Sequence, residues 1–446
     1  MPSLRQGSNA AAEVWRTQLW PVPTLCVALA VGLGVVLPRL DARIDDDLPD
    51  ALTAYLFSGG PEAARTVLSA AAGSLITVTS LTFSLTVVTL QLASSQYSPR
   101  LLRTFTRDRV VHLCLGLLLA TFTYALTVLR TVRTSLSEQT AFVPQISVTV
   151  AFVLTLASVL ILVAFLAHLS RQLRVEWMLR QVHAETKETM HRVLPGISGD
   201  TKAPAAPANA ALLCAGSSGF LTSIDETGVL AVAARTGTVV VIDRRPGDSL
   251  VAGTPIASAW RDDGRDLDDE QRDALTNCLD AAVRTGFERT TAQDVAFGVR
   301  QLVDVVVKAL SPGVNDPTTA VHGLGHVAAL MCELAAHELG PRLLRDDEGR
   351  VRVVLSRPGF DELLELAVAQ PCRYGAAEPA VLSRLLVMLR EIAWTTTDPA
   401  HRAAVVRQLD RLARAASPPD LDADDRARLS DQARTVREAL AGRWTG

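Results

Sequence analysis

The stretch Ser74–Thr89, SLITVTSLTFSLTVVT, carries a hydroxyl group at nearly every second position. Its alternation of polar and apolar residues is typical of a half-buried strand. However, no charged residue occurs between Arg65 and Arg100. A charge-free segment of this length can cross a membrane, where the backbone must satisfy its own hydrogen bonds. We therefore predict a membrane-spanning helix here, and not a strand.

The composition of the 446 residues supports an integral membrane protein. Hydrophobic residues make up 48% of the chain and the mean hydropathy is +0.23, with the apolar residues concentrated in the first 170 positions. The net charge of −3 argues against nucleic acid as a partner. The six cysteines are scattered without a CxxC motif, which gives no indication of a disulfide framework or a zinc site.

The charge-free windows predict four transmembrane helices, and the lipid bilayer is the first expected partner. The expected spans are about 18–38, 66–95, 110–129 and 145–168. Arginines cluster before the first span, after the second and after the fourth, whereas acidic residues dominate the connection 39–65. By the positive-inside rule, we expect a multi-pass protein of the bacterial inner membrane with both termini in the cytoplasm.

The hydroxyl groups of the second span form two stripes on opposite sides of a helix. One stripe contains Ala70, Gly73, Thr77, Ser80, Ser84 and Gln91, and the other contains Thr79, Thr82, Thr86 and Thr89. Both stripes could be packing surfaces, because small and hydroxyl residues let membrane helices approach closely. Alternatively, Thr77, Ser80, Ser84 and Gln91 could line a water-filled path between the subunits of a homo-oligomer. Both interpretations remain open at this point.

Three arginines follow the second span at helical spacing: Arg100, Arg103 and Arg107. They could contact anionic lipid at the inner leaflet, as positive-inside residues commonly do. They could also form an electropositive mouth that concentrates anions.

The C-terminal half is expected to be a cytoplasmic α+β structure that is mostly helical. Residues 171–210 should form a juxtamembrane helix followed by an Ala/Pro-rich linker. Short β-like runs predict a small β-module over residues 211–261. Residues 262–446 read as helices, many of them rich in Arg, Asp and Glu.

The most unusual soluble segment is ERTTAQDVAFGVRQLVDVVVKALSPGVNDPTTA, residues 288–320. Its polar candidates are Arg289, Asp294, Arg300, Asp304, Asn315 and Asp316. A carboxylate buried in LVDVVV requires a partner such as Arg289 or Arg300. Asp316-Pro317 is a typical helix start, with an N-cap aspartate and a proline at the first helical position. These residues could form a satisfied polar core with a capped turn, or a ligand pocket.

The sequence gives little support for a metal centre or for an enzymatic activity. His322 and His326 are one helical turn apart, but no third ligand has suitable spacing, and we expect no metal and no cofactor. The chain has no GxxxxGK[ST], GxGxxG after a strand, HExxH or GxSxG motif. A hydrolase at the Asp/Asn cluster would need a metal ion.

Two segments together resemble a known family. AAGSLITVTSLTFSLTVVTLQLASSQYSPRLLRTFTRD (71–108) and residues 288–320 are similar to the bacterial predicted-membrane-protein family known as domain of unknown function 2254. The hairpin PGDSLVAGTPI (246–256) also fits this family. The resemblance implies an integral membrane protein with a cytoplasmic C-terminal half, and it implies no activity.

Two functional hypotheses follow from the sequence. The leading one is an oligomeric channel-like or transport protein with a cytoplasmic regulatory domain, which would pass ions or a small solute. The alternative is a membrane-anchored scaffold or sensor that binds a small ligand or a protein through its cytoplasmic domain.

Overall fold

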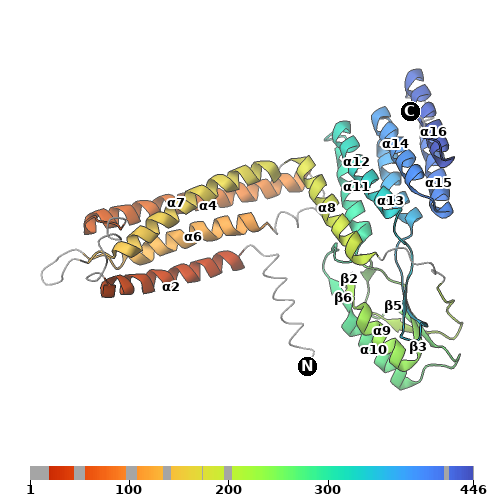
Figure 1. The fold of residues 1–446 in the computed structure, drawn as a ribbon, viewed down its shortest axis with the longest axis horizontal. Helices are drawn as coiled ribbons and strands as arrows, with labels where there is room; N and C mark the ends of the chain where they lie inside the picture. Colours follow the sequence, from red (N-terminus) through yellow and green to blue (C-terminus); the bar gives the residue numbers. More distant parts are fainter. Residues whose placement is uncertain are drawn as a thin grey trace. The chain divides into compact units, whose positions relative to one another are not determined.

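The computed structural model divides the chain into two compact units, residues 1–174 and 175–446. The structure describes residues 20–44, 56–96, 108–133, 142–172, 174–194, 203–415 and 421–444. The first unit is built from helices, and the second combines helices with β-sheets (Figure 1). The predicted fold class is confirmed to this extent: apolar helices near the N-terminus precede a mostly helical half that contains some sheet.

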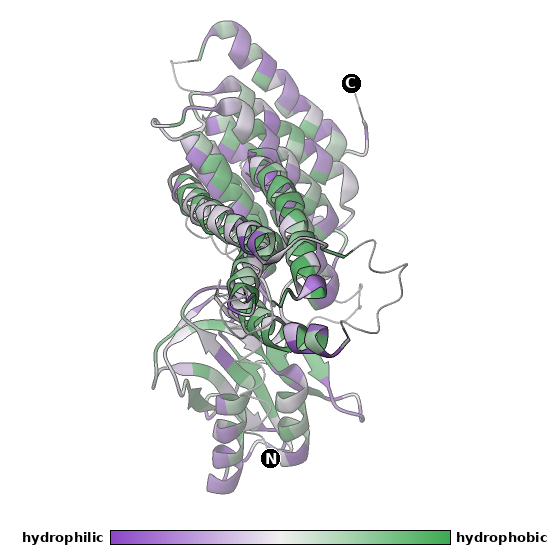
Figure 2. Ribbon diagram, turned by 90° about the vertical axis from the view of Figure 1, so that its left-hand side faces the viewer, coloured by the Kyte–Doolittle hydropathy of each residue, from purple (hydrophilic) through white to green (hydrophobic). Residues whose placement is uncertain are grey.

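Within the described residues, four helices are long and apolar enough to cross a membrane. They are α2 (Pro21–Ile44), α4 (Pro61–Gln96), α6 (Arg109–Leu129) and α7 (Gln145–Gln172). Figure 2 shows apolar residues in green along these helices. The stretch 74–89 lies inside α4, so the helical interpretation is confirmed and the strand is excluded.

Helix α6 is the central helix of the first unit, because it packs against α2, α4 and α7. Leu118, Tyr124 and Val128 on α6 are fully buried. The outward faces of α4 and α7 instead carry exposed side chains such as Phe83 and Leu160. Large apolar side chains therefore face outward as well as inward. This distribution suits a unit surrounded by hydrocarbon, where exposed apolar side chains carry no free-energy penalty.

A buried carboxylate joins the end of α2 to the start of α7. Asp41 is only 3% exposed, and its carboxylate accepts hydrogen bonds from the backbone N–H groups of Ile146 and Ser147 at 3.0 and 2.9 Å. The Ser147 hydroxyl donates a third bond at 2.5 Å. Asp41 therefore caps the N-terminus of α7 from another helix, where the helix dipole favours a negative charge.

The opposite end of α7 is held by a second aspartate. Asp108 caps α6 by accepting a bond from the Val110 N–H at 2.8 Å. Its other carboxylate oxygen lies 2.5 Å from His168 Nε2 and accepts a bond from the Gln172 side chain. Since His168 and Gln172 belong to the last turns of α7, aspartates from α2 and α6 fix the two ends of this helix.

The second unit contains two sheets in the described part of the chain. The larger sheet has the strand order β1-β5-β3-β8-β7 and is antiparallel except for the β3–β8 pair. The smaller sheet has the order β4-β2-β6 and is antiparallel. The strands are β1 (Ala211–Cys214), β2 (Gly219–Ile224), β3 (Thr238–Ile242), β4 (Ser249–Leu250), β5 (Pro255–Arg261), β6 (Val283–Gly286), β7 (Arg342–Arg345) and β8 (Val351–Leu355).

These sheets extend beyond the segment 211–261 in which strands were expected. Strand β6 joins the smaller sheet, and β7 and β8, which begin at residues 342 and 351, join the larger one. These strands are four or five residues long. Such short strands pair with partners far away in the sequence, so the local pattern gives no signal for them.

Helices cover the sheets and form a separate layer in the second unit. Helices α9 (Glu226–Thr236) and α10 (Asp269–Ala282) share a hydrophobic core with the strands. The other helices are α8 (Val175–Val193), α11 (Val295–Ala309), α12 (Pro317–Leu334), α13 (Phe360–Tyr374), α14 (Pro379–Thr395), α15 (Pro399–Ala415) and α16 (Ala423–Leu440). Helix α8 packs against α11 and α12, which places its C-terminal end beside the sheets.

The cap at Asp41 gives a testable prediction about the first unit. Asp41→Ala removes three hydrogen bonds to the start of α7, so we expect the free energy of unfolding to fall by about 2 kcal/mol. Asp41→Asn keeps a side-chain acceptor and should lose less. Thermal unfolding of the purified protein in detergent measures this order, and equal stability of Asp41→Ala and the wild type would contradict it.

Candidate functional site

The two hydroxyl stripes of α4 have different surroundings in the chain. Thr79, Thr82 and Thr89 are buried, and their hydroxyl groups donate to carbonyl oxygens one turn back at 2.6–2.8 Å. This stripe therefore packs inside its own unit. The other stripe lies on the opposite side of α4, and its members Gly73, Thr77, Ser80, Ser84 and Gln91 are exposed.

The arginines expected near the membrane, Arg100, Arg103 and Arg107, lie outside the described residues.

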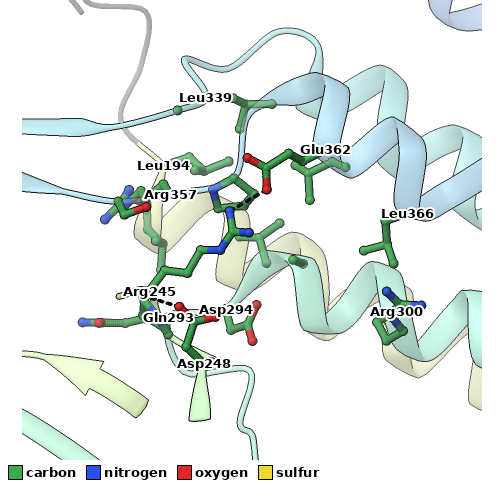
Figure 3. A pocket seen from close by; sticks show the side chains of 18 of the residues that line it. Leu194, Arg245, Asp248, Gln293, Asp294, Arg300, Leu339, Arg357, Glu362 and Leu366 are labelled. Carbon is green, nitrogen blue, oxygen red and sulfur yellow. Dashed lines mark hydrogen bonds and ion pairs between the residues drawn. The ribbon is translucent and has the colours of Figure 1, made fainter. Parts of the chain in front are cut away.

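A pocket in the second unit brings together several of the predicted polar residues. Its volume is about 270 Å³, and arginines are prominent in its walls (Figure 3). The lining arginines are Arg245, Arg289, Arg300 and Arg357, and the lining carboxylates are Asp248, Asp294 and Glu362. The walls come from the loop after β3, the first turn of α11, the end of α8 and the first turn of α13. We call this cavity the arginine pocket.

A buried ion pair forms the floor of the arginine pocket. Asp294 is 4% exposed, and its carboxylate accepts a bond at 2.6 Å from Arg289 Nη2. The other carboxylate oxygen accepts the Phe297 N–H at 2.9 Å, which makes Asp294 the N-cap of α11. Burial raises the pKa of Asp294, and the Arg289 guanidinium and the Phe297 N–H oppose that rise.

The turn after β3 packs directly on this ion pair. Gly247 has a φ of 99°, in the region that favours glycine, and a Cβ there would lie 2.2 Å from a carboxylate oxygen of Asp294 and 2.6 Å from Arg289 Nη2. Only glycine fits such a close approach. The two soluble segments singled out in the sequence, 246–256 and 288–320, therefore meet at the arginine pocket.

Arg357 ties the end of α8 to the sheet region. Its guanidinium donates to the Val193 carbonyl oxygen at 2.6 Å and to Glu226 at 2.9 Å. Arg342 also pairs with Glu226, at 3.1 Å. A cation at the C-terminal end of a helix satisfies carbonyl groups that lack partners inside the helix. Arg357 and Glu226 are thus committed to holding α8 in place.

The contacts that Arg245 and Arg300 make with Glu362 and Gln370 lie nearer the protein surface. Arg245 Nη1 lies 2.7 Å from Glu362, but the two side chains are 36% and 52% exposed. Arg300 donates to Gln370 at 3.2 Å. Figure 3 shows Arg300 and Leu366 at one end of the pocket, apart from Arg245 and Glu362.

The other predicted polar residues do not line the arginine pocket. Asp304 is half-buried further along α11. Asn315 has a φ of 49° and lies in the turn after α11, where its N–H donates to Ser311 O at 2.9 Å. Asp316 caps α12 by accepting bonds from the Thr319 N–H and hydroxyl group, which lower the pKa of Asp316. Asn315 and Asp316 therefore shape a turn.

In the described part of the chain, no group of three or more His, Cys, Asp and Glu side chains could hold a metal ion. His326 lies 5.2 Å from His183 of α8, measured between ring centroids. The neighbouring His322 is 4.0 Å from Glu176.

Arg245, Arg357 and Glu362 were missed as site residues. They lie in separate segments, after β3, after β8 and in the first turn of α13. Since arginine is frequent in this chain, no local pattern distinguishes these residues from surface arginines.

The two helix caps of this region allow a matched comparison. Asp316→Ala removes a partly exposed cap and should lower the free energy of unfolding by about 1 kcal/mol. Asp294→Ala also takes the carboxylate away from Arg289, so we expect a larger loss, about 2–3 kcal/mol. Thermal unfolding of both variants tests the order. A loss for Asp294→Ala no larger than that for Asp316→Ala would contradict the role of the ion pair.

Comparisons with known proteins agree with the resemblance seen in the sequence. The model of the family described as "Predicted membrane protein (DUF2254)" matches residues 16–391. Two relatives, described as uncharacterized proteins of Mycobacterium bovis and Mycobacterium tuberculosis, are each 35% identical over 444 residues, which is 98% of this chain and 84% of each relative. No solved structure matches the chain. The chain therefore belongs to the domain of unknown function 2254 family of predicted membrane proteins.

Proposed function

We propose that this membrane protein is a homo-oligomeric, channel-like protein of the bacterial inner membrane, and that its second unit is a cytoplasmic regulatory domain. Arg5 and Arg16 precede α2, whereas six acidic residues lie between positions 39 and 65. Arg171 lies in the last turn of α7, and Arg174 follows two residues after the helix ends. This asymmetry supports an orientation with both termini in the cytoplasm.

The exposed stripe of α4 is the observation that carries the channel hypothesis. Gly73, Thr77, Ser80, Ser84 and Gln91 point away from the other helices of the first unit, on the side opposite the buried threonines. Exposed apolar side chains flank the stripe, among them Leu81 and Phe83. A polar stripe facing lipid gains nothing, whereas copies of α4 around a shared axis would give it helix contacts or water.

A bulky side chain in the stripe should block the path. We expect Ser84→Trp to abolish most ion flux through the protein in liposomes while the oligomer persists, because an indole replaces a small group on the proposed axis. The matched control is Phe83→Trp, which enlarges a neighbouring side chain on a different face of α4. Unchanged flux in Ser84→Trp, with flux present in the wild type, would contradict the pore assignment.

Gly73 lies on the same side of α4 but outside the proposed pore-lining set, and we expect it to mark the surface through which the subunits associate. A Cβ at Gly73 would meet no atom of the chain within 4 Å, so Gly73→Leu should leave the folded subunit as stable as the wild type. It should nevertheless weaken association, because a larger residue keeps neighbouring helices apart.

Gly32→Leu is the control for this variant, since Gly32 on α2 is also exposed and its Cβ would also meet open space. Native mass spectrometry or light scattering in detergent measures the oligomer. Equal oligomer fractions for the two variants would argue against α4 as the contact.

The arginine pocket favours a second candidate function, a membrane-anchored sensor that binds a small ligand. The pocket is a concave site in which several arginines lie beside apolar side chains, so it offers a ligand both convergent polar groups and apolar surface. This function and the channel are compatible, because a ligand bound to the second unit could regulate a pore.

A further inference from the structure

We propose that the arginine pocket binds a small organic oxyanion, a phosphate or carboxylate group on an apolar body, and that the oxyanion replaces Glu362 as the partner of Arg245. The proposed ligand class rests on the second candidate function described above. It does not depend on the presence of a pore.

The pocket arginines differ in how firmly their partners hold them. The Arg289–Asp294 pair includes a carboxylate that is 4% exposed and caps a helix. Arg357 is 12% exposed and bonds to both Glu226 and the end of α8. Breaking either arrangement would leave buried charge without its partner, at high cost. These two arginines are therefore structural.

The Arg245–Glu362 pair is the exchangeable one. Both side chains are more than one third exposed, and an ion pair of this kind contributes little to stability, about 0–1 kcal/mol. Figure 3 shows Glu362 reaching into the pocket from α13. The Glu362 carboxylate thus occupies the position where a ligand oxyanion would bind Arg245, and it can return to solvent at small cost.

Backbone groups add positive potential to the same cavity. The first turns of α11 and α13 both contribute to its walls, through Val295 and Ala296 and through Glu362 and Leu363. The N-cap of α13 is Gly359, which provides no side-chain hydrogen bond to the first turn. Helix N-termini carry partial positive charge. Asp294 already caps α11, so the start of α13 is the helix end that favours an additional anion here.

The remaining side chains of the pocket wall and the pocket volume indicate what kind of ligand would fit. Leu194, Leu339, Leu363 and Leu366 line the cavity. They favour an apolar body beside the anionic group. The volume of about 270 Å³ lies just below the range of about 300–1,000 Å³ that is typical of ligand pockets, which suits a small metabolite. Because Leu194 directly follows α8, such a ligand would also contact the end of that helix.

Calorimetric titration of the protein in nanodiscs tests this assignment. The probes are phenyl phosphate and benzoate, with benzyl alcohol as the neutral control. We expect the wild type to bind at least one of the two anions and not the alcohol. Absence of binding by both anions would overturn the inference, and the predictions for Ser84 and Gly73 would stand unaffected.

Two variants should change the affinity in opposite directions. Arg245→Gln removes a charge-assisted hydrogen bond and should weaken binding about tenfold or more. Glu362→Gln removes the competing carboxylate and should strengthen binding several-fold. Arg434→Gln, which alters an exposed arginine paired with Asp431 and Glu438 on α16, should bind like the wild type.

Folding defects and lipid effects can be separated from the proposed exchange. A misfolded variant would lose binding, so tighter binding by Glu362→Gln cannot result from misfolding, and weaker or unchanged binding by this variant would refute the exchange. Nanodiscs of phosphatidylcholine and of phosphatidylglycerol should give the same affinity. Loss of binding in phosphatidylglycerol alone would mean that a lipid headgroup occupies the pocket, which would refute a soluble ligand.

Discussion

The carboxylate of Asp41 sets the arrangement of the first unit. It lies in an apolar surrounding where water cannot satisfy it, and the first N–H groups of α7 have no partners inside their own helix. The Asp41 carboxylate and these N–H groups satisfy each other by hydrogen bonding. This contact fixes the end of α2 against the start of α7. Helix α6 fills the space between its neighbours, and Asp108 holds the far end of α7. With α4 packed on α6 and its threonine stripe buried, the opposite stripe of α4 faces outward.

The sequence predicts local features of this protein well. Charge-free windows locate the apolar helices, and Asp316-Pro317 begins α12 as expected, because length, hydropathy and caps depend on neighbouring residues. Contacts between distant residues are different. In the sequence, Asp41 belongs to an acidic connection between two apolar spans. In the structure it is buried against Ser147, 106 residues away. Likewise, the periodicity of α4 gives two stripes, but only the packing of α6 decides which of them is buried.

Within the segment 288–320, some of the predicted site residues reach the arginine pocket and others do not. Arg289 lies in the segment before α11, Asp294 caps the helix and Arg300 lies in its second turn, and all three line the arginine pocket. Asp304 is ten residues beyond Asp294, about 15 Å along the helix, and cannot reach the same cavity. Helical geometry could have separated these residues in advance. The partners from other segments, Arg245 and Glu362, could not have been found, because their proximity depends on how the sheet and α13 are placed.

Carboxylates in this protein serve as fixed or exchangeable partners according to their burial. Asp41 and Asp294 are nearly inaccessible, and each satisfies backbone N–H groups at the start of a helix, so removing either one exposes several unsatisfied groups at once. Glu362 instead pairs with Arg245 at a partly exposed position and can exchange that partner for water. A binding site needs both kinds of group, because fixed partners keep the cavity open and exchangeable ones give way to a ligand.

The end of α8, held by Arg357, borders that cavity, and α8 follows α7 in the chain after only two residues. Binding in the arginine pocket would therefore act on the helix that directly succeeds a membrane span.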